Sequence, residues 1–382
     1  MPEEVFTQLS WFRRERVAQA RVMVVGCGAL GNEVLKNLVL FGVQHLTVVD
    51  FDHVEAPNLS RSILFTHEDA DEHARKTDAV ARSIRRINPS AEVVTLFGDV
   101  AYDVGLGWFR SVDVVIGCVD NRWARYCINR QCMRAGVPWV DGGIDGLEGT
   151  ARVFIPGQNC YACNLGPEGL REMHRRLSCT NTIRINEAAG RVPTTPVIAS
   201  VIGAVQAQEA MKLIHKEQLE QGELTSLCGK MFCYEGQHLT TRTVNFRAWD
   251  DDCPVHTRWT PVEQVPLTNR HTVSEAMDIL RTRLQNDNIR ISLTRDCFVD
   301  CLVHRTDNSR IEVMTPKHKI SGGKQIDNGQ QRIAEDYYVN EFYEIDGSFP
   351  YPELTLARLG IPSQDVLPVH TDTEDHYVEL IG

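Results

Sequence analysis

The sequence lacks the features of a membrane, secreted or nucleic-acid-binding protein. No run of eighteen or more apolar residues occurs in its 382 residues, so nothing in it predicts a membrane span. The N-terminal stretch "MPEEVFTQLSWFRRER" has no apolar signal core, and we therefore expect a cytoplasmic protein. The formal net charge is -11, which argues against nucleic acid as the main partner, because phosphate binding needs a basic surface.

Internal repeats, low-complexity segments and a Ser-His-Asp triad are also missing. The twelve cysteines stand in a large chain without a signal peptide. They are therefore expected to include metal ligands and reactive or buried thiols rather than a disulfide framework. Hydrophobic residues make up 42% and charged residues 24%, which is ordinary for a globular protein with a large core.

Apolar strands alternate with amphipathic helices over the first 150 residues. The predicted strands are "RVMVVG", "HLTVVDFD", "AEVVTLFGDV", "VDVVIGCVD" and "VPWVDGGIDG", and the helices between them end near Gly42, Pro89 and Gly136. This alternation predicts an α/β fold with a doubly wound, mostly parallel sheet whose ligand binds at the carboxyl ends of the strands. The character changes near residue 258. We therefore predict one domain over 1–257 and a small C-terminal α/β appendage over 258–382.

A glycine-rich turn follows the first strand. Gly26, Gly28 and Gly31 allow a tight turn and let a phosphate approach the amides at the start of the next helix. Asp50 ends the second strand, where a carboxylate can accept hydrogen bonds from ribose hydroxyls. The pattern predicts an adenosine-phosphate site, but the turn alone does not separate NAD, FAD, S-adenosylmethionine and ATP.

The residues after Asp50 favour a triphosphate. Asn58 and Arg61 follow the second strand, and Lys76 begins the next helix. Such converging donors can offset the charge that develops during phosphoryl or adenylyl transfer. Hydride transfer does not need them. Asp120 ends another strand, where its carboxylate can hold Mg²⁺ on the phosphates. ATP with Mg²⁺ is therefore expected, and an NAD oxidoreductase is the more distant alternative.

Two short pairs of ligand residues are spaced for a metal. They are Cys160 with Cys163 and Cys253 with His256. Brought together, they predict a structural Zn²⁺ site, because four protein ligands leave no open position. The alternative is two unrelated pairs, with Cys228 or Cys233 as a substitute ligand.

Several long segments together resemble the ubiquitin-activating, E1-like family, which includes the bacterial ThiF and MoeB adenylyltransferases. They are "RVMVVGCGALGNEVLKNLVLFGVQHLTVVDFDHVEAPNLSRS", "DVVIGCVDNRWARYCINRQC", "VPWVDGGIDGLEGTARVF" and the Cys160/Cys163 pair. The resemblance covers about residues 8–257. It implies that the chain uses Mg-ATP to adenylate the C-terminal glycine of a ubiquitin-like protein, releasing pyrophosphate.

The resemblance also implies roles for particular residues. The glycine turn holds the nucleotide, Asp50 the ribose and Asp120 the metal, while the phosphates contact Asn58, Arg61 and Lys76. Arg14 in "WFRRER", with Arg13 beside it, matches an arginine that reaches into a partner subunit's site, although Glu15 stands where the family has glutamine. An arginine that one subunit supplies to the site of another implies a homodimer, because this single chain carries all the parts of the site.

Cys179 in "HRRLSCTNT" resembles the catalytic-cysteine region of true E1 enzymes. Arg175 and Arg176 nearby would lower its pKa, and the thiolate could take the activated carbonyl from the adenylate as a thioester. Transfer to an E2-like carrier would follow, and the segment 258–382 is a candidate for recruiting it. The alternatives are a sulfur-carrier adenylyltransferase without a thioester step, with Cys179 an ordinary loop residue, and an inactive scaffold.

Overall fold

The computed structural model describes residues 6–178, 194–247, 249–320 and 337–381. Residues 179–193, which include Cys179, lie outside these ranges. The chain divides into two compact units, which we describe separately. Unit 1 comprises residues 1–100, 109–170 and 192–258, and unit 2 comprises residues 101–108, 171–191 and 259–382.

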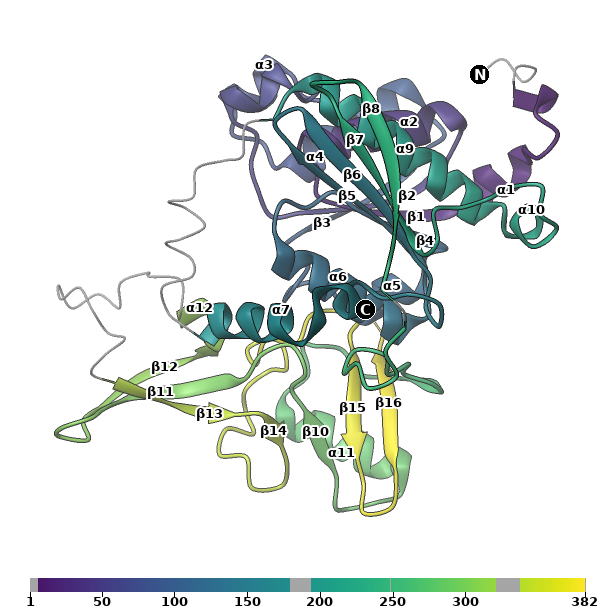
Figure 1. Cartoon of the computed structure of the whole chain (residues 1–382). Helices are drawn as coiled ribbons and strands as arrows, with labels where there is room; N and C mark the ends of the chain where they lie inside the picture. Colours follow the sequence, from purple (N-terminus) through teal and green to yellow (C-terminus); the bar gives the residue numbers. More distant parts are fainter. Residues whose placement is uncertain (1–5, 179–193, 248, 321–336, 382) are drawn as a thin grey trace. The chain divides into compact units, whose positions relative to one another are not determined.

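Unit 1 is built on an eight-stranded sheet with the order β3-β2-β1-β4-β5-β6-β7-β8 (Figure 1). The first five in chain order are parallel: β1 Arg21–Val25, β2 His45–Asp50, β3 Glu92–Phe97, β4 Val114–Gly117 and β5 Trp139–Asp145. The last three are antiparallel: β6 Glu148–Phe154, β7 Lys230–Glu235 and β8 Thr240–Asn245. The doubly wound, mostly parallel sheet is confirmed. Its order reverses between β1 and β4, which is where such sheets bind ligands.

Four helices pack on the strands of this sheet: α2 Ala29–Phe41, α4 Lys76–Ile87, α6 Arg122–Ala135 and α9 Pro196–Ile214. The other described helices up to residue 220 are α1 Arg14–Gln19, α3 His67–Asp71, α5 Leu106–Arg110, α7 Tyr161–Ser178 and α10 Lys216–Glu220, and parts of α5 and α7 belong to unit 2. Helix α2 contacts α4 and α9, whereas α6 packs on β4 and β5. Right-handed crossovers place α6 on the face opposite α2 (Figure 1). Gly42 and Gly136 end α2 and α6 in the left-handed conformation, at φ of 99° and 74°.

Helix α9 is mostly buried inside the fold. Within the described residues it is the one helix long and apolar enough to cross a membrane, by length and composition alone. Ile202, Ala207 and Met211 are fully buried, and Gly203 lies against Glu33 of α2, where an added Cβ would come within 2.7 Å of the Glu33 side chain. These contacts are those of a core helix.

The N-terminal segment is anchored by His215, which is fully buried at the end of α9. Its Nε2 accepts a hydrogen bond from the Arg13 backbone N–H at 2.9 Å, and its Nδ1 donates to the Met211 carbonyl at 2.7 Å. Trp11 and Phe12 pack their rings against it. Within residues 6–20, the segment forms a short helical turn at Phe6–Gln8 and then α1.

Acid is expected to destabilise unit 1 through His215. Burial lowers its pKa, and the neighbouring Arg16 and Arg13 lower it further. In the unfolded chain the histidine has an ordinary pKa of about 6.5. It is therefore protonated in the unfolded chain at a pH where it is still neutral in the folded chain, so stability falls as the pH drops below about 6.5. We expect the midpoint of thermal unfolding to fall less steeply with acid in His215→Gln than in the parent chain. The exposed His238→Gln is the control, and equal pH slopes in all three proteins would contradict the prediction.

Unit 2 contains two small sheets (Figure 1). One has the order β14-β10-β15-β16-β9 and the other β12-β11-β13. The strands are β9 Val262–Val265, β10 Arg290–Ser292, β11 Phe298–His304, β12 Arg310–Pro316, β13 Tyr337–Phe342, β14 Glu344–Ile345, β15 Val366–His370 and β16 Asp375–Leu380, with helices α11 Val273–Leu284 and α12 Lys317–Ile320. The last stretch, residues 354–381, forms turns and then the β15–β16 hairpin.

Residues 101–108 belong to unit 2 although they follow β3 in the chain. The Leu106 N–H donates to Asp365 Oδ1 at 2.8 Å, and Arg295 holds the same carboxylate with two hydrogen bonds of 2.8 and 2.9 Å. The Gly107 N–H donates to the Gln364 carbonyl. The sequence gives no indication that residues 101–108 belong to unit 2, because these residues show no periodic pattern.

Candidate active site and metal centre

The glycine turn lies at the switch point between β1 and β4. Gly26 has φ +94°, and a Cβ there would lie 2.5 Å from the Cys118 carbonyl oxygen at the end of β4. A Cβ on Gly31 would lie 1.9 Å from the Gly26 carbonyl oxygen. Gly28, in contrast, has open space where its side chain would be. Two glycines therefore close the turn, and the third leaves the start of α2 accessible to a phosphate.

Asp50 and Asn32 hold this turn from two sides. Asp50 accepts hydrogen bonds from the backbone N–H groups of Cys27 at 2.6 Å and Asp52 at 2.8 Å. Burial raises the pKa of Asp50, while the Lys76 ammonium lowers it in part. Asn32 is fully buried and donates to the carbonyls of Cys27 and Gly28. Asn32 was not among the predicted site residues, because an asparagine inside an amphipathic helix carries no functional signal.

The predicted phosphate contacts follow β2. Lys76 begins α4, and its buried ammonium lies 2.7 Å from Asp52 Oδ2. Asn58 is buried and accepts from the Glu55 backbone N–H at 2.9 Å, which closes the loop after Asp52. Arg61 is half-buried and donates to the Pro57 carbonyl at 3.0 Å. Lys76 thus stands beside Asp50 and Asp52 at the carboxyl end of β2, where a nucleotide phosphate could exchange for the Asp52 carboxylate.

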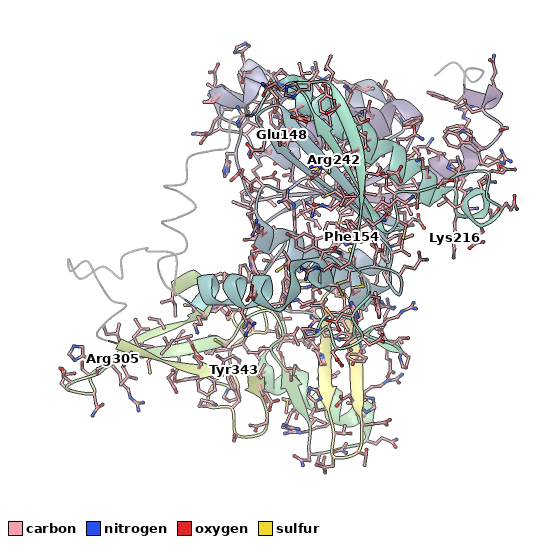
Figure 2. All side chains as sticks on the ribbon, in the orientation of Figure 1. Glu148, Phe154, Lys216, Arg242, Arg305 and Tyr343 are labelled. Carbon is pink, nitrogen blue, oxygen red and sulfur yellow. The ribbon has the colours of Figure 1, made fainter. Side chains whose placement is uncertain are left out.

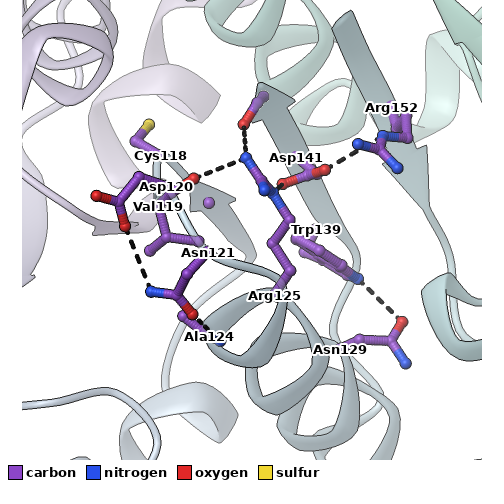
Figure 3. A network of polar contacts seen from close by, with 12 residues as sticks. Cys118, Val119, Asp120, Asn121, Ala124, Arg125, Asn129, Trp139, Asp141 and Arg152 are labelled. Carbon is purple, nitrogen blue, oxygen red and sulfur yellow. Dashed lines mark hydrogen bonds and ion pairs between the residues drawn. The ribbon is translucent and has the colours of Figure 1, made fainter. Parts of the chain in front are cut away.

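Asp120 is exposed just beyond β4. Its Oδ1 accepts from Asn121 Nδ2 at 3.3 Å, and Asn121 caps α6 by accepting from the Ala124 N–H (Figure 3). A solvent-facing carboxylate at the switch point fits a hard cation such as Mg²⁺, which prefers one or two carboxylates together with substrate phosphates and water.

The structure does not bring Arg14 to its own glycine turn. Arg14 is exposed on α1, which precedes the amino end of β1, so the length of that strand separates it from the glycine turn. Cys179 lies outside the described residues, as does the rest of its predicted loop.

The four predicted zinc ligands lie together. The ligand atoms of Cys160, Cys163, Cys253 and His256 are all within 4.8 Å of one another. Cys163 Sγ lies 3.2 Å from His256 Nε2, and the His256 ring stacks on Trp249. Cys228 instead contacts Gln158 and Asn159. The Cys₃His set fits tetrahedral zinc, and the cluster contains neither Cys228 nor Cys233.

Asn129 supports this cluster from α6. It is fully buried, and its Nδ2 donates to Cys160 Sγ at 3.2 Å while its Oδ1 accepts from the Tyr161 N–H at 3.0 Å. Burial raises the pKa of the Cys160 thiol to about 12, so a bound cation is what would hold it as a thiolate. A donor to the ligand sulfur orients it and stabilises its charge.

The fold and site define a class, namely nucleotide-binding proteins with a doubly wound sheet, a glycine turn at its switch point and a carboxylate at the end of β2. The sequence model of the ThiF family matches residues 6–255. The chain therefore belongs to the ThiF family of E1-like adenylyltransferases. This membership implies ATP rather than NAD as the nucleotide.

The relatives are consistent with this assignment. The chain is 35% identical to the SAMP-activating enzyme E1 of Haloferax volcanii over 240 residues, 63% of this chain and 81% of that one. It is 32% identical to the mouse adenylyltransferase and sulfurtransferase MOCS3 over 241 residues, 63% of this chain and 48% of that one, so it spans about half of the mouse protein. The crystal structure of E. coli MccB with succinimide shares the fold, with a TM-score of 0.51 and 20% identity over 64% of this chain and 67% of that chain.

Proposed function

We propose that the chain activates a ubiquitin-like or sulfur-carrier protein by adenylating its C-terminal glycine. Family membership carries this proposal, and the names of two relatives, an activating enzyme E1 and an adenylyltransferase–sulfurtransferase, give it a substrate class. A carboxylate oxygen of the substrate attacks the α-phosphorus of ATP, the bond to the β-phosphate oxygen breaks, and pyrophosphate leaves. The carboxylate is already ionised at neutral pH, so the step needs no strong base.

The residues at the switch point have separate parts in this step. The glycine turn and Asp50 hold the adenosine and phosphates, and Lys76, Arg61 and Asn58 offset charge on the triphosphate. Mg²⁺ held by Asp120 would neutralise further phosphate charge and orient the leaving group.

A protein substrate fits the antiparallel edge of the sheet. All six residues of the edge strand β8 are exposed, Arg242 among them (Figure 2). Leu147 and Leu239, at the two hairpin turns, are 52% and 77% exposed. An edge strand offers unpaired backbone groups, and an exposed apolar side chain on each turn favours a protein partner over a small molecule.

We further propose a homodimer in which Arg14 serves the partner's site, because Arg14 lies at the amino end of β1 and away from its own glycine turn. Residues 258–382 would form the accessory domain, and an E2-like carrier is the partner proposed for it. Sulfur-carrier activation without a thioester is the second candidate, supported by the relative that is named a sulfurtransferase.

The thioester step at Cys179 is tested by intact-mass measurement. The protein is mixed with Mg-ATP and small proteins encoded beside its gene that end in glycine, under non-reducing conditions. We expect a thiol-sensitive covalent adduct that is lost in Cys179→Ala. The adduct should persist in Cys228→Ala, a half-buried cysteine that is not one of the four cluster residues. An AMP adduct of the substrate without a covalent enzyme species would instead establish the sulfur-carrier reaction, and no adenylate with any substrate would contradict both.

A further inference from the structure

Behind the switch point, a buried network of three charges links α6, β5 and β6 (Figure 3). Asp141 on β5 is fully buried. Its Oδ1 accepts from Arg125 Nε at 2.9 Å, and its Oδ2 lies 3.2 Å from Arg152 Nε. Removing charges from water carries a desolvation penalty of several kcal/mol per ion. Burying a carboxylate between two guanidinium groups is therefore costly unless good geometry and further hydrogen bonds offset that penalty.

The Arg125 side chain makes two more hydrogen bonds, one to the backbone of the loop after β4 and one to the backbone of β5. Its Nη2 donates to the carbonyl of Val119 at 2.7 Å and to that of Gly142 at 3.0 Å (Figure 3). Val119 immediately precedes Asp120, so the guanidinium holds the peptide that carries this carboxylate. Burial by itself would lower the pKa of Arg125, but the Asp141 carboxylate raises it above its ordinary value.

The surrounding residues leave this arrangement little freedom. A Cβ on Gly142 would lie 2.3 Å from Gln206 Oε1, and Gln206 Nε2 donates to the Gly117 carbonyl at 2.9 Å. A Cβ on Gly143 would lie 3.3 Å from Arg125 Nη2. The "DGG" sequence of β5 thus supplies a carboxylate for the Arg125 side chain and then two residues small enough to pack against it and Gln206.

We infer that Arg125, held in place by Asp141, is a positioning residue for Asp120. The inference rests on the proposed function, in which Asp120 binds the metal. Two contacts orient Asp120. Asn121 donates to its side chain, and Arg125 donates to the Val119 carbonyl in the peptide bond that precedes it. A lysine could keep the charge of Arg125 but has no planar fork with which to bond Asp141, Val119 and Gly142 together.

The test measures metal affinity apart from turnover. Mn²⁺ binding is followed by electron paramagnetic resonance in the presence of a non-hydrolysable ATP analogue, for the parent chain, Arg125→Lys and Asp141→Asn. We expect the Kd for Mn²⁺ to rise about 10- to 100-fold in both variants, as for residues that orient metal ligands. Binding of the analogue in EDTA should change much less.

A buried arginine–aspartate pair elsewhere provides the matched control. Arg295 and Asp365 in unit 2 are as buried as Arg125 and Asp141 and share two hydrogen bonds. Arg295→Lys is expected to leave Mn²⁺ affinity unchanged. If it lowers that affinity as much as Arg125→Lys does, the effect is general destabilisation and the inference is wrong.

Asp120→Ala separates this inference from the proposed function. If Asp120→Ala leaves Mn²⁺ affinity unchanged, the metal assignment fails and the positioning role fails with it. If Asp120→Ala weakens binding but Arg125→Lys does not, only the positioning role is overturned. When both weaken it, the double variant must bind Mn²⁺ no more weakly than Asp120→Ala, because a residue acting through Asp120 has no further effect once it is gone. Should Arg125→Lys fail to fold, Asp141→Asn, which keeps the shape of the side chain, decides by the same comparison.

Discussion

Lys76→Ala is expected to lower the rate of ATP–pyrophosphate exchange by about 100- to 1000-fold, the range found when one group that stabilises transition-state charge is removed. Lys76 is buried beside Asp52 at the carboxyl end of β2, with its ammonium 2.7 Å from the carboxylate. A triphosphate carries more negative charge than Asp52 and would compete for this ammonium. The loss should appear mainly in kcat if the contact strengthens as pyrophosphate leaves.

Lys36→Ala is the matched control for this experiment. Lys36 also pairs with a carboxylate, Glu33, and lies on α2 away from its N-terminal turn. Its replacement should leave exchange within about a factor of two, because the Lys36 ammonium pairs with Glu33 and the predicted phosphate contacts lie on other segments. An exchange rate within about threefold of the parent chain in Lys76→Ala would show that the phosphates bind elsewhere.

Loss of the metal is expected to unfold unit 1 at a markedly lower temperature. The parent protein should contain one zinc per chain by elemental analysis, and Cys163→Ser should lose it. Structural zinc contributes about 10 kcal/mol or more to folding in small domains. Even half of that would lower the unfolding midpoint by roughly 10–20 °C for about 200 residues. Treatment of the parent protein with a strong chelator should give the same shift.

Cys132→Ser is the control for Cys163→Ser. It measures how much stability is lost when a buried thiol that binds no metal is replaced by a hydroxyl. Cys132 is fully buried in α6 and is not part of the zinc cluster. We expect it to keep its zinc and to lose much less stability than Cys163→Ser. Equal losses in the two variants, or a parent protein without zinc, would refute the assignment.

Local sequence patterns were sufficient for the adenylation fold. Continuous apolar runs predicted the parallel strands, because strands buried on both faces show no alternation. Glycines at 42 and 136 marked helix ends that the structure places at the same residues. The cluster of four candidate metal ligands was predicted because the two metal-binding residues of each short pair stand close together in the sequence.

The residues that support these sites were not predicted. Asn32, Asn129 and Asp141 are polar residues within apolar elements, and only their partners show what they do. Each forms hydrogen bonds or ion pairs to groups that lie at different distances along the chain, from 4 to 32 residues away. No periodicity relates such partners.

The sequence by itself therefore determined the alternating strands and helices of the first 150 residues, the glycine turn and the two pairs of candidate metal ligands, because each depends on neighbouring residues or on short fixed spacing. Only the tertiary structure decided which strands flank the switch point, that residues 101–108 join unit 2, and that Arg125 holds the backbone before Asp120. These features arise when segments far apart in the chain pack together. Burial then makes a hydrogen bond or a charge pair obligatory, whatever the local pattern of the sequence.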